Sequence, residues 1–271
     1  MAGGDKEHKM LFDLRGGRRG SVVKVVYAVL AVLMGASLFL TVGPFSISEI
    51  FNSGGGASDL AKPYEEEAER IEARLEKDPN NPQMLLSLTR AQINAGNAEA
   101  KREANGEVIL TQDSVRSYQQ ADQTWSEYLK ATDKPNVALA ALVAPMLLQL
   151  AEVGSSYPEI DRNVAAAAEA QQIVAEDRPS VNSLSTLAYY TYFTGDFAAA
   201  DRARAEAKKL AKAKTERDAI DETLGEYKKN ATRYISAKKQ TEKAEKASGG
   251  KAPENLQNSL SPGLGGGGLG E

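Results

Sequence analysis

Residues 181–214 read VNSLSTLAYYTYFTGDFAAADRARAEAKKLAKAK and predict a hairpin of two helices. Leu184 and Leu187 are large apolar residues of the first helix. Gly195 is expected to end that helix, because a glycine adopts a left-handed conformation that costs other residues energy. The leucines and the aromatic Phe197 are expected to fill the space between neighbouring hairpins. Three small residues are expected where the two helices cross: Ala188, Ala200 and Ala207.

A similar but interrupted hairpin is predicted at residues 82–135. Its first part contains Leu85, Leu88 and Gly96-Asn97, and Trp125 is expected in the core as a large residue of the second helix. The second helix begins late, so residues 98–113 are an insertion. We expect this insertion to be a helix extension with a turn at Asn105-Gly106.

The rest of residues 59–246 also has helical composition, since Ala, Glu, Lys, Leu and Arg lose little rotamer freedom in a helix. Residues 137–173 predict a middle hairpin with a long turn at 154–158. Residues 64–75 resemble the second helix of a half-repeat. Residues 215–246 predict a charged cap, whose outer face must meet water.

On these residues, the segment 59–246 resembles the tetratricopeptide repeat superfamily, most clearly at 181–214. The resemblance implies an all-α solenoid of helical hairpins, with a concave groove that is lined by first helices and binds a peptide or protein. The layout of the whole chain resembles a bacterial ancillary subunit of the secretory translocon, which has one membrane anchor and an exported tetratricopeptide domain.

A transmembrane helix is predicted at residues 22–43. Val25 to Val42 contains no charge and is long enough for a hydrocarbon core about 30 Å thick. Arg15, Arg18 and Arg19 precede it, so the positive-inside rule predicts a cytoplasmic basic tail at 1–21 and an extracytoplasmic remainder. A buried core helix and a cleaved signal peptide are the alternatives to this uncleaved signal anchor.

Two further segments lack a helical pattern. Residues 44–58 contain NSGGGAS and predict a flexible linker between membrane and domain. Residues 247–271 end in GLGGGGLGE and predict a disordered tail, because they carry too little apolar surface to order themselves.

The composition argues against metal-binding, cofactor-binding and catalytic sites. The chain has no cysteine, and its one histidine, His8, lies before the apolar segment, so we predict neither a metal site, nor a cofactor, nor catalytic residues. A peptidase or isomerase subunit is a further functional hypothesis, but the sequence contains no catalytic constellation for it. The formal net charge is −4. Residues 1–24 carry a basic excess, which leaves the remainder acidic, so a nucleic-acid partner is not expected.

An aromatic patch is the candidate partner-binding site. It lies on a predicted first helix, where consecutive residues point in different directions, so one i, i+3 pair is expected to be accessible. The alternative is that the patch packs between repeats. Its members are Tyr189, Tyr190, Tyr192 and Phe193.

The sequence thus predicts a membrane-anchored, single-pass scaffold of the cell membrane, not an enzyme. Its repeat domain would bind a protein or peptide outside the cytoplasm, at the secretion or protein-folding machinery, and residues 22–43 would contact the lipid bilayer. The alternative is a structural protein that forms homo-oligomers through its repeat domain, with the charged terminal helix as the interface.

Overall fold

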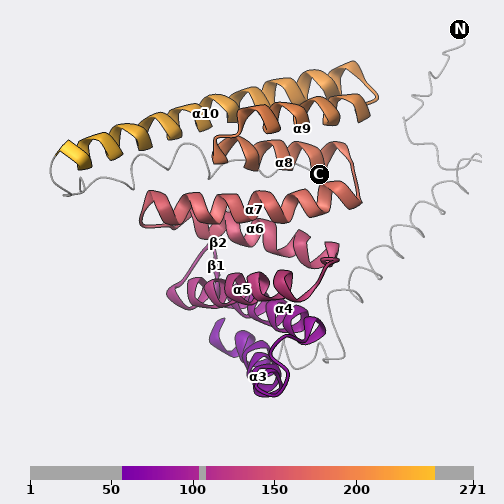
Figure 1. Cartoon of the computed structure of the whole chain (residues 1–271), viewed down its shortest axis with the longest axis vertical. Coiled ribbons are helices and arrows are strands. Elements are labelled where there is room, and N and C mark those ends of the chain that lie inside the picture. The colour runs from indigo at the N-terminus through magenta and orange to yellow at the C-terminus, as the bar shows by residue number, and fades with distance from the viewer. Residues whose placement is uncertain (1–56, 104–107, 248–271) are drawn as a thin grey trace, which may run out of the picture. The chain divides into compact units, whose positions relative to one another are not determined.

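The computed structural model describes residues 57–103 and 108–247 (Figure 1), which belong to one compact unit of the chain. In these residues it has eight packed helices and one pair of short strands. The helices are α3 (Ala57–Leu75), α4 (Pro82–Glu99), α5 (Gln112–Ala131), α6 (Val137–Glu152), α7 (Tyr157–Asp177), α8 (Val181–Thr194), α9 (Phe197–Leu210) and α10 (Lys214–Ala247).

Consecutive helices pack in pairs. The pairs α4 with α5, α6 with α7 and α8 with α9 form hairpins, α3 packs on α4, and α10 packs on α8 and α9. Helix α7 also packs on α8, which joins the second hairpin to the third. The prediction of an all-helical domain built from hairpins is confirmed for the described residues.

The hairpin α8–α9 follows the local signals of its sequence. Ser180 and Ser183 form a capping box at the start of α8, and Gly195 ends it with a φ of 89°. The side chain of Asp196 then accepts a hydrogen bond of 2.9 Å from the Ala199 amide and so starts α9. The small residues predicted at the helix crossing are all fully buried: Ala188, Ala200 and Ala207.

Helix α4 continues through Gly96 and Asn97 to Glu99. Gly96 allows α4 and α5 to pack closely. A Cβ atom there would lie 2.5 Å from two ring carbons of Tyr118 on α5. The hydroxyl of Tyr118 donates a 2.7 Å hydrogen bond to the Asn97 side chain, which holds the ring against the helix.

The insertion after α4 is not the helix extension that we expected. Strands β1 (Lys101–Arg102) and β2 (Val108–Ile109) form an antiparallel pair there, with Lys101 opposite Ile109. The turn expected at Asn105-Gly106 lies outside the described residues. Helix α5 then begins with a capping box at Thr111.

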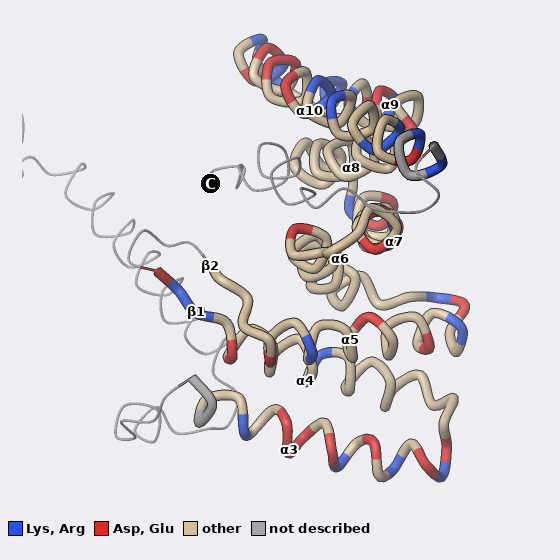
Figure 2. Tube along the Cα trace, turned by 90° about the vertical axis from the view of Figure 1, so that its left-hand side faces the viewer, with Lys and Arg blue, Asp and Glu red and all other residues tan. Residues whose placement is uncertain are grey.

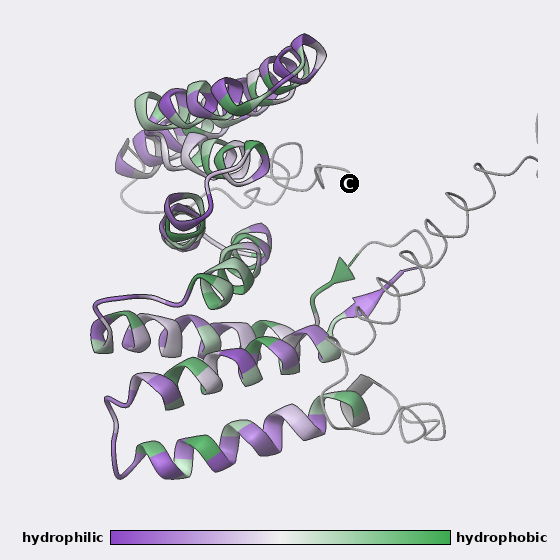
Figure 3. Ribbon diagram, turned by 90° about the vertical axis from the view of Figure 1, so that its right-hand side faces the viewer, coloured by the Kyte–Doolittle hydropathy of each residue, from purple (hydrophilic) through white to green (hydrophobic). Residues whose placement is uncertain are grey.

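The middle hairpin has a shorter turn than predicted. Helix α7 begins at Tyr157, so Pro158 lies in its first turn, where a missing amide hydrogen has no cost. Helix α6 has no charge before Glu152 and is largely hydrophobic (Figure 3). Leu142 on its outer side is 41% exposed and not in the core.

Helix α10 carries interleaved acidic and basic residues (Figure 2). One face is nevertheless buried through Ile220, Leu224, Tyr227, Ala231 and Tyr234, at the helical spacing of 3 or 4. Within the described helices, none combines the length and apolar character needed to cross a bilayer. The predicted membrane segment 22–43, the basic tail 1–21 and all of the tail 247–271 beyond its first residue lie outside the described residues. So does the predicted linker 44–58 up to residue 56, whereas Ala57 and Ser58 belong to α3.

Candidate functional site

The aromatic patch predicted to bind a partner is buried. Tyr189, Tyr190, Tyr192 and Phe193 are each less than a tenth exposed, so the expectation that one pair would be accessible is wrong. The covering element is α10. Its Tyr227 ring lies 4.3 Å from the Tyr189 ring between centroids, and its Tyr234 ring lies 6.2 Å from Phe193.

Polar contacts hold this cover in place. The Tyr192 hydroxyl donates a 2.7 Å hydrogen bond to Asp201 on α9, and Lys228 of α10 pairs with the same carboxylate at 2.6 Å. Burial, followed by the bond to Asp201, raises the pKa of Tyr192 to about 12. The Lys228 hydrogen bond holds the pKa of Asp201 below its usual range. The patch and α10 therefore form one polar and aromatic interface between helices.

A second link joins α9 to α10. Arg204 on α9 approaches Asp221 on α10 to 2.6 Å, and Lys208 also pairs with Asp221. All three side chains keep some exposure to solvent, so each pair adds little alone. Together with the Asp201 cluster they fix how α10 lies on the last hairpin.

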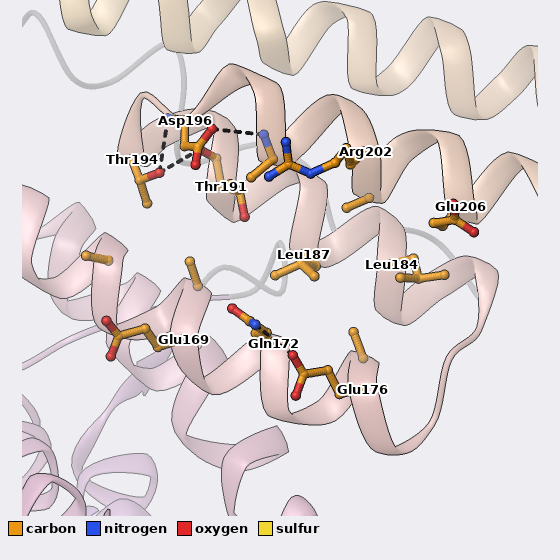
Figure 4. Close-up of a pocket in the computed structure, with 15 residues that line it drawn as sticks. Glu169, Gln172, Glu176, Leu184, Leu187, Thr191, Thr194, Asp196, Arg202 and Glu206 are labelled. Atoms are coloured by element: carbon orange, nitrogen blue, oxygen red, sulfur yellow. Dashed lines mark hydrogen bonds between the residues drawn. The ribbon is translucent and has the colours of Figure 1, made fainter.

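An open groove lies elsewhere, between α7 and α9, with α8 between them (Figure 4). Its volume is about 570 Å³. Small residues make up much of its surface, and the buried ones are Ala168, Ala175 and Ala203. Leu184 and Leu187 project from α8 toward the space and are only half-buried. The groove is thus a shallow apolar surface with room for larger side chains.

The rim of the groove is acidic. Glu169 and Glu176 lie on the α7 side, and Asp196 and Glu206 on the α9 side, against one basic residue, Arg202. Glu176 accepts a 2.7 Å hydrogen bond from Gln172, and Glu206 pairs with Lys209 at 2.5 Å. Among the described residues, Glu169 and Arg202 have no hydrogen-bond or ion-pair partner. The four acidic residues outnumber Arg202 and Lys209, so the rim carries an excess of negative charge.

The groove differs from the one that the sequence resemblance implies. Its two sides are α7 and α9, the second helices of their hairpins, whereas the implied groove is lined by first helices. Sequence reasoning named Leu184 and Leu187 but expected them to fill the space between hairpins, whereas both are only half-buried and line the groove. It missed the other lining residues because they come from three helices between positions 165 and 206. The one available signal was weak: Glu169 and Glu176 share a helix face, as solvent-exposed residues commonly do.

Glu152, the last residue of α6, has an unusual electrostatic setting. Burial raises the pKa of its carboxyl to about 7, and its charge in turn raises the pKa of Tyr190 after the larger effect of burial. The side chain still reaches solvent. Glu152 is therefore a surface carboxyl with restricted hydration, next to the aromatic patch.

Within residues 57–103 and 108–247, no three side chains of the metal-binding types converge on a point. No family model matches the chain, and neither a curated protein nor a solved structure matches it. The geometry of the groove is accordingly the basis for a functional argument.

Proposed function

We propose that this protein is a membrane-anchored scaffold whose tetratricopeptide-like domain holds a protein partner outside the cytoplasm. One observation carries the proposal: the open groove along α7, α8 and α9. Half-buried leucines and unpaired charge occur there together, and this combination of an apolar centre with a polar rim is typical of protein-binding surfaces.

The tetratricopeptide character is supported by the last hairpin. Gly195, Asp196 and Phe197 form the turn expected of such a repeat, and the small residues at the crossing are buried. The anchoring role rests on the uncharged run from Val25 to Val42, and the extracytoplasmic position rests on the basic residues before it.

Site-specific photo-crosslinking tests the scaffold. A photoreactive residue replaces Leu187 in the groove of the full chain, in cells that produce the protein. We expect a discrete adduct with another protein. The same residue in place of Gln123, which is exposed on α5 and outside the groove, is the control and is expected to form no such adduct.

The outcomes separate the two candidate functions. An adduct between Leu187 of one copy and a second copy of the chain would support the self-associating structural protein instead. Equal labelling at both positions, or none at either, would contradict binding through the groove.

A further inference from the structure

The sides of the groove suit a helix better than an extended chain. They consist of three α-helices, whose backbone N–H and C=O groups are paired within each helix along the groove. An extended peptide would find no strand edge to pair with and would lose hydration from its own backbone. A helix brings a backbone that is already hydrogen-bonded.

The size of the groove fits a short helical face. On α7 the groove-lining residues run from Ala165 to Glu176, which spans about 16 Å at 1.5 Å per residue. That length corresponds to about three turns. Alanines between larger residues leave hollows, and Leu184 and Leu187 offer apolar contact to side chains that enter them.

The rim selects for positive charge. The rim carries four acidic residues, two on each long side, against Arg202 and the Lys209 that pairs with Glu206. A helix that lies between them brings the residues flanking its apolar stripe close to both rows. Lysine or arginine at these flanking positions would meet opposite charge, whereas acidic residues would be repelled.

We propose that the groove between α7 and α9 binds a basic amphipathic α-helix of a partner protein, with large apolar residues along one face and Lys or Arg on both flanks. This inference rests on the proposed scaffold function and names the kind of segment that the scaffold holds. Apolar contact supplies the affinity, and the acidic rim supplies selectivity and a dependence on salt.

Three labelled peptides test the proposal by fluorescence anisotropy against the full chain. The first is an 18-residue helix-forming peptide of Leu, Ala and Lys, with Leu along one face and Lys on both flanks. The second has Glu in place of Lys. The third has the composition of the first in an order that breaks the apolar face. We expect the first to bind at least about tenfold more tightly than the others, and more weakly as salt rises.

Charge reversal localises the binding. Glu169→Lys with Glu176→Lys, on the α7 side of the groove, is expected to weaken binding of the first peptide about tenfold. The matched control is Glu69→Lys with Glu76→Lys. These exposed residues have the same spacing and lie outside the groove, so the net charge changes equally and affinity is expected to stay within about twofold. Far-ultraviolet circular dichroism checks that both variants keep the helical content.

Several results would overturn the inference. They are equal binding of the ordered and reordered basic peptides, equal binding of the Lys and Glu peptides, or equal loss in the groove and control variants. The scaffold function would survive any of these if photo-crosslinking at Leu187 still gave its discrete adduct, and it would fall separately if that adduct did not form.

Discussion

The Tyr234 hydroxyl on α10 donates a 2.8 Å hydrogen bond to Asp161 Oδ1 on α7, 73 residues earlier in the chain. Lys238, one turn further along α10, pairs with the same carboxylate. The Tyr234 ring also lies 5.7 Å from that of Tyr157, at the start of α7. Asp161 of the middle hairpin therefore links α7 directly to the terminal helix α10.

Removing this tie should loosen α10. Tyr234→Phe deletes one hydrogen bond and is expected to lower the free energy of unfolding by about 1 kcal/mol. Asp161→Ala leaves the buried Tyr234 hydroxyl and Lys238 without their partner and is expected to cost about 1–3 kcal/mol. Urea unfolding followed by circular dichroism measures both.

The control is Asp218→Ala, which removes an exposed ion pair with Lys214 and is expected to cost less than about 0.5 kcal/mol. If Asp161→Ala cost no more than this control, α10 would not depend on the Asp161 contacts.

Two helical glycines should respond in opposite ways to alanine. Gly96→Ala places a Cβ atom 2.5 Å from the buried Tyr118 ring, and we expect a loss of about 1–3 kcal/mol of stability. Gly225→Ala on α10 meets nothing within 4 Å and is expected to gain up to about 1 kcal/mol from helix propensity. Thermal melting compares them. Equal shifts would mean that α4 and α5 do not approach closely at Gly96.

The aromatic patch should behave as core. Tyr190→Ala with Phe193→Ala, and separately Tyr189→Ala with Tyr192→Ala, are both expected to lower stability by several kcal/mol, because truncating a buried aromatic residue costs about 3–5 kcal/mol. Asn182→Ala, at an exposed position of the same helix, is the control. Wild-type melting of either double variant would show that its two residues lie free of α10.

Glu152 should make stability depend on pH. Its pKa is about 7 in the folded chain against 4.5 for an ordinary glutamic acid, so the folded state binds this proton more tightly. Stability is therefore expected to fall as pH rises from about 4.5 through 7. Because the side chain also meets solvent, the effect should be smaller than for a fully buried carboxyl.

Glu152→Gln removes that titration. Its melting temperature relative to wild type should be higher at pH 8 than at pH 5. If the melting temperatures of the variant and wild type differed equally at both pH values, the pKa of Glu152 would not be raised by folding.

The proposed orientation in the membrane rests on Arg15, Arg18, Arg19 and Lys24 before the apolar run. A reporter that works only outside the cytoplasm should be active when fused after Glu271 and inactive when fused before Met10. The reverse result would contradict the orientation. Mature protein that begins beyond Gly43 would contradict the anchor.

Local chemistry explains which features of the fold could be predicted from sequence. Gly195 ends α8 because glycine adopts positive φ without steric cost, and Asp196 caps α9 through its own carboxylate. Ala188 and Ala200 are small where two neighbouring helices meet. Each of these effects acts within one hairpin, so the sequence by itself determined the two helices of this hairpin, their pairing and the turn between them.

Only the tertiary structure decided which faces of those helices are covered. Helical phase predicts that one i, i+3 pair of the aromatic patch is accessible, but Tyr227 and Tyr234 of α10 pack over Tyr189 and Phe193. The groove likewise exists because α7 and α9 lie apart across α8. Helical periodicity shows which residues share a face, and it carries no information on the distant element that packs there. The exposed binding surface therefore depends on the placement of whole helices and not on any local pattern.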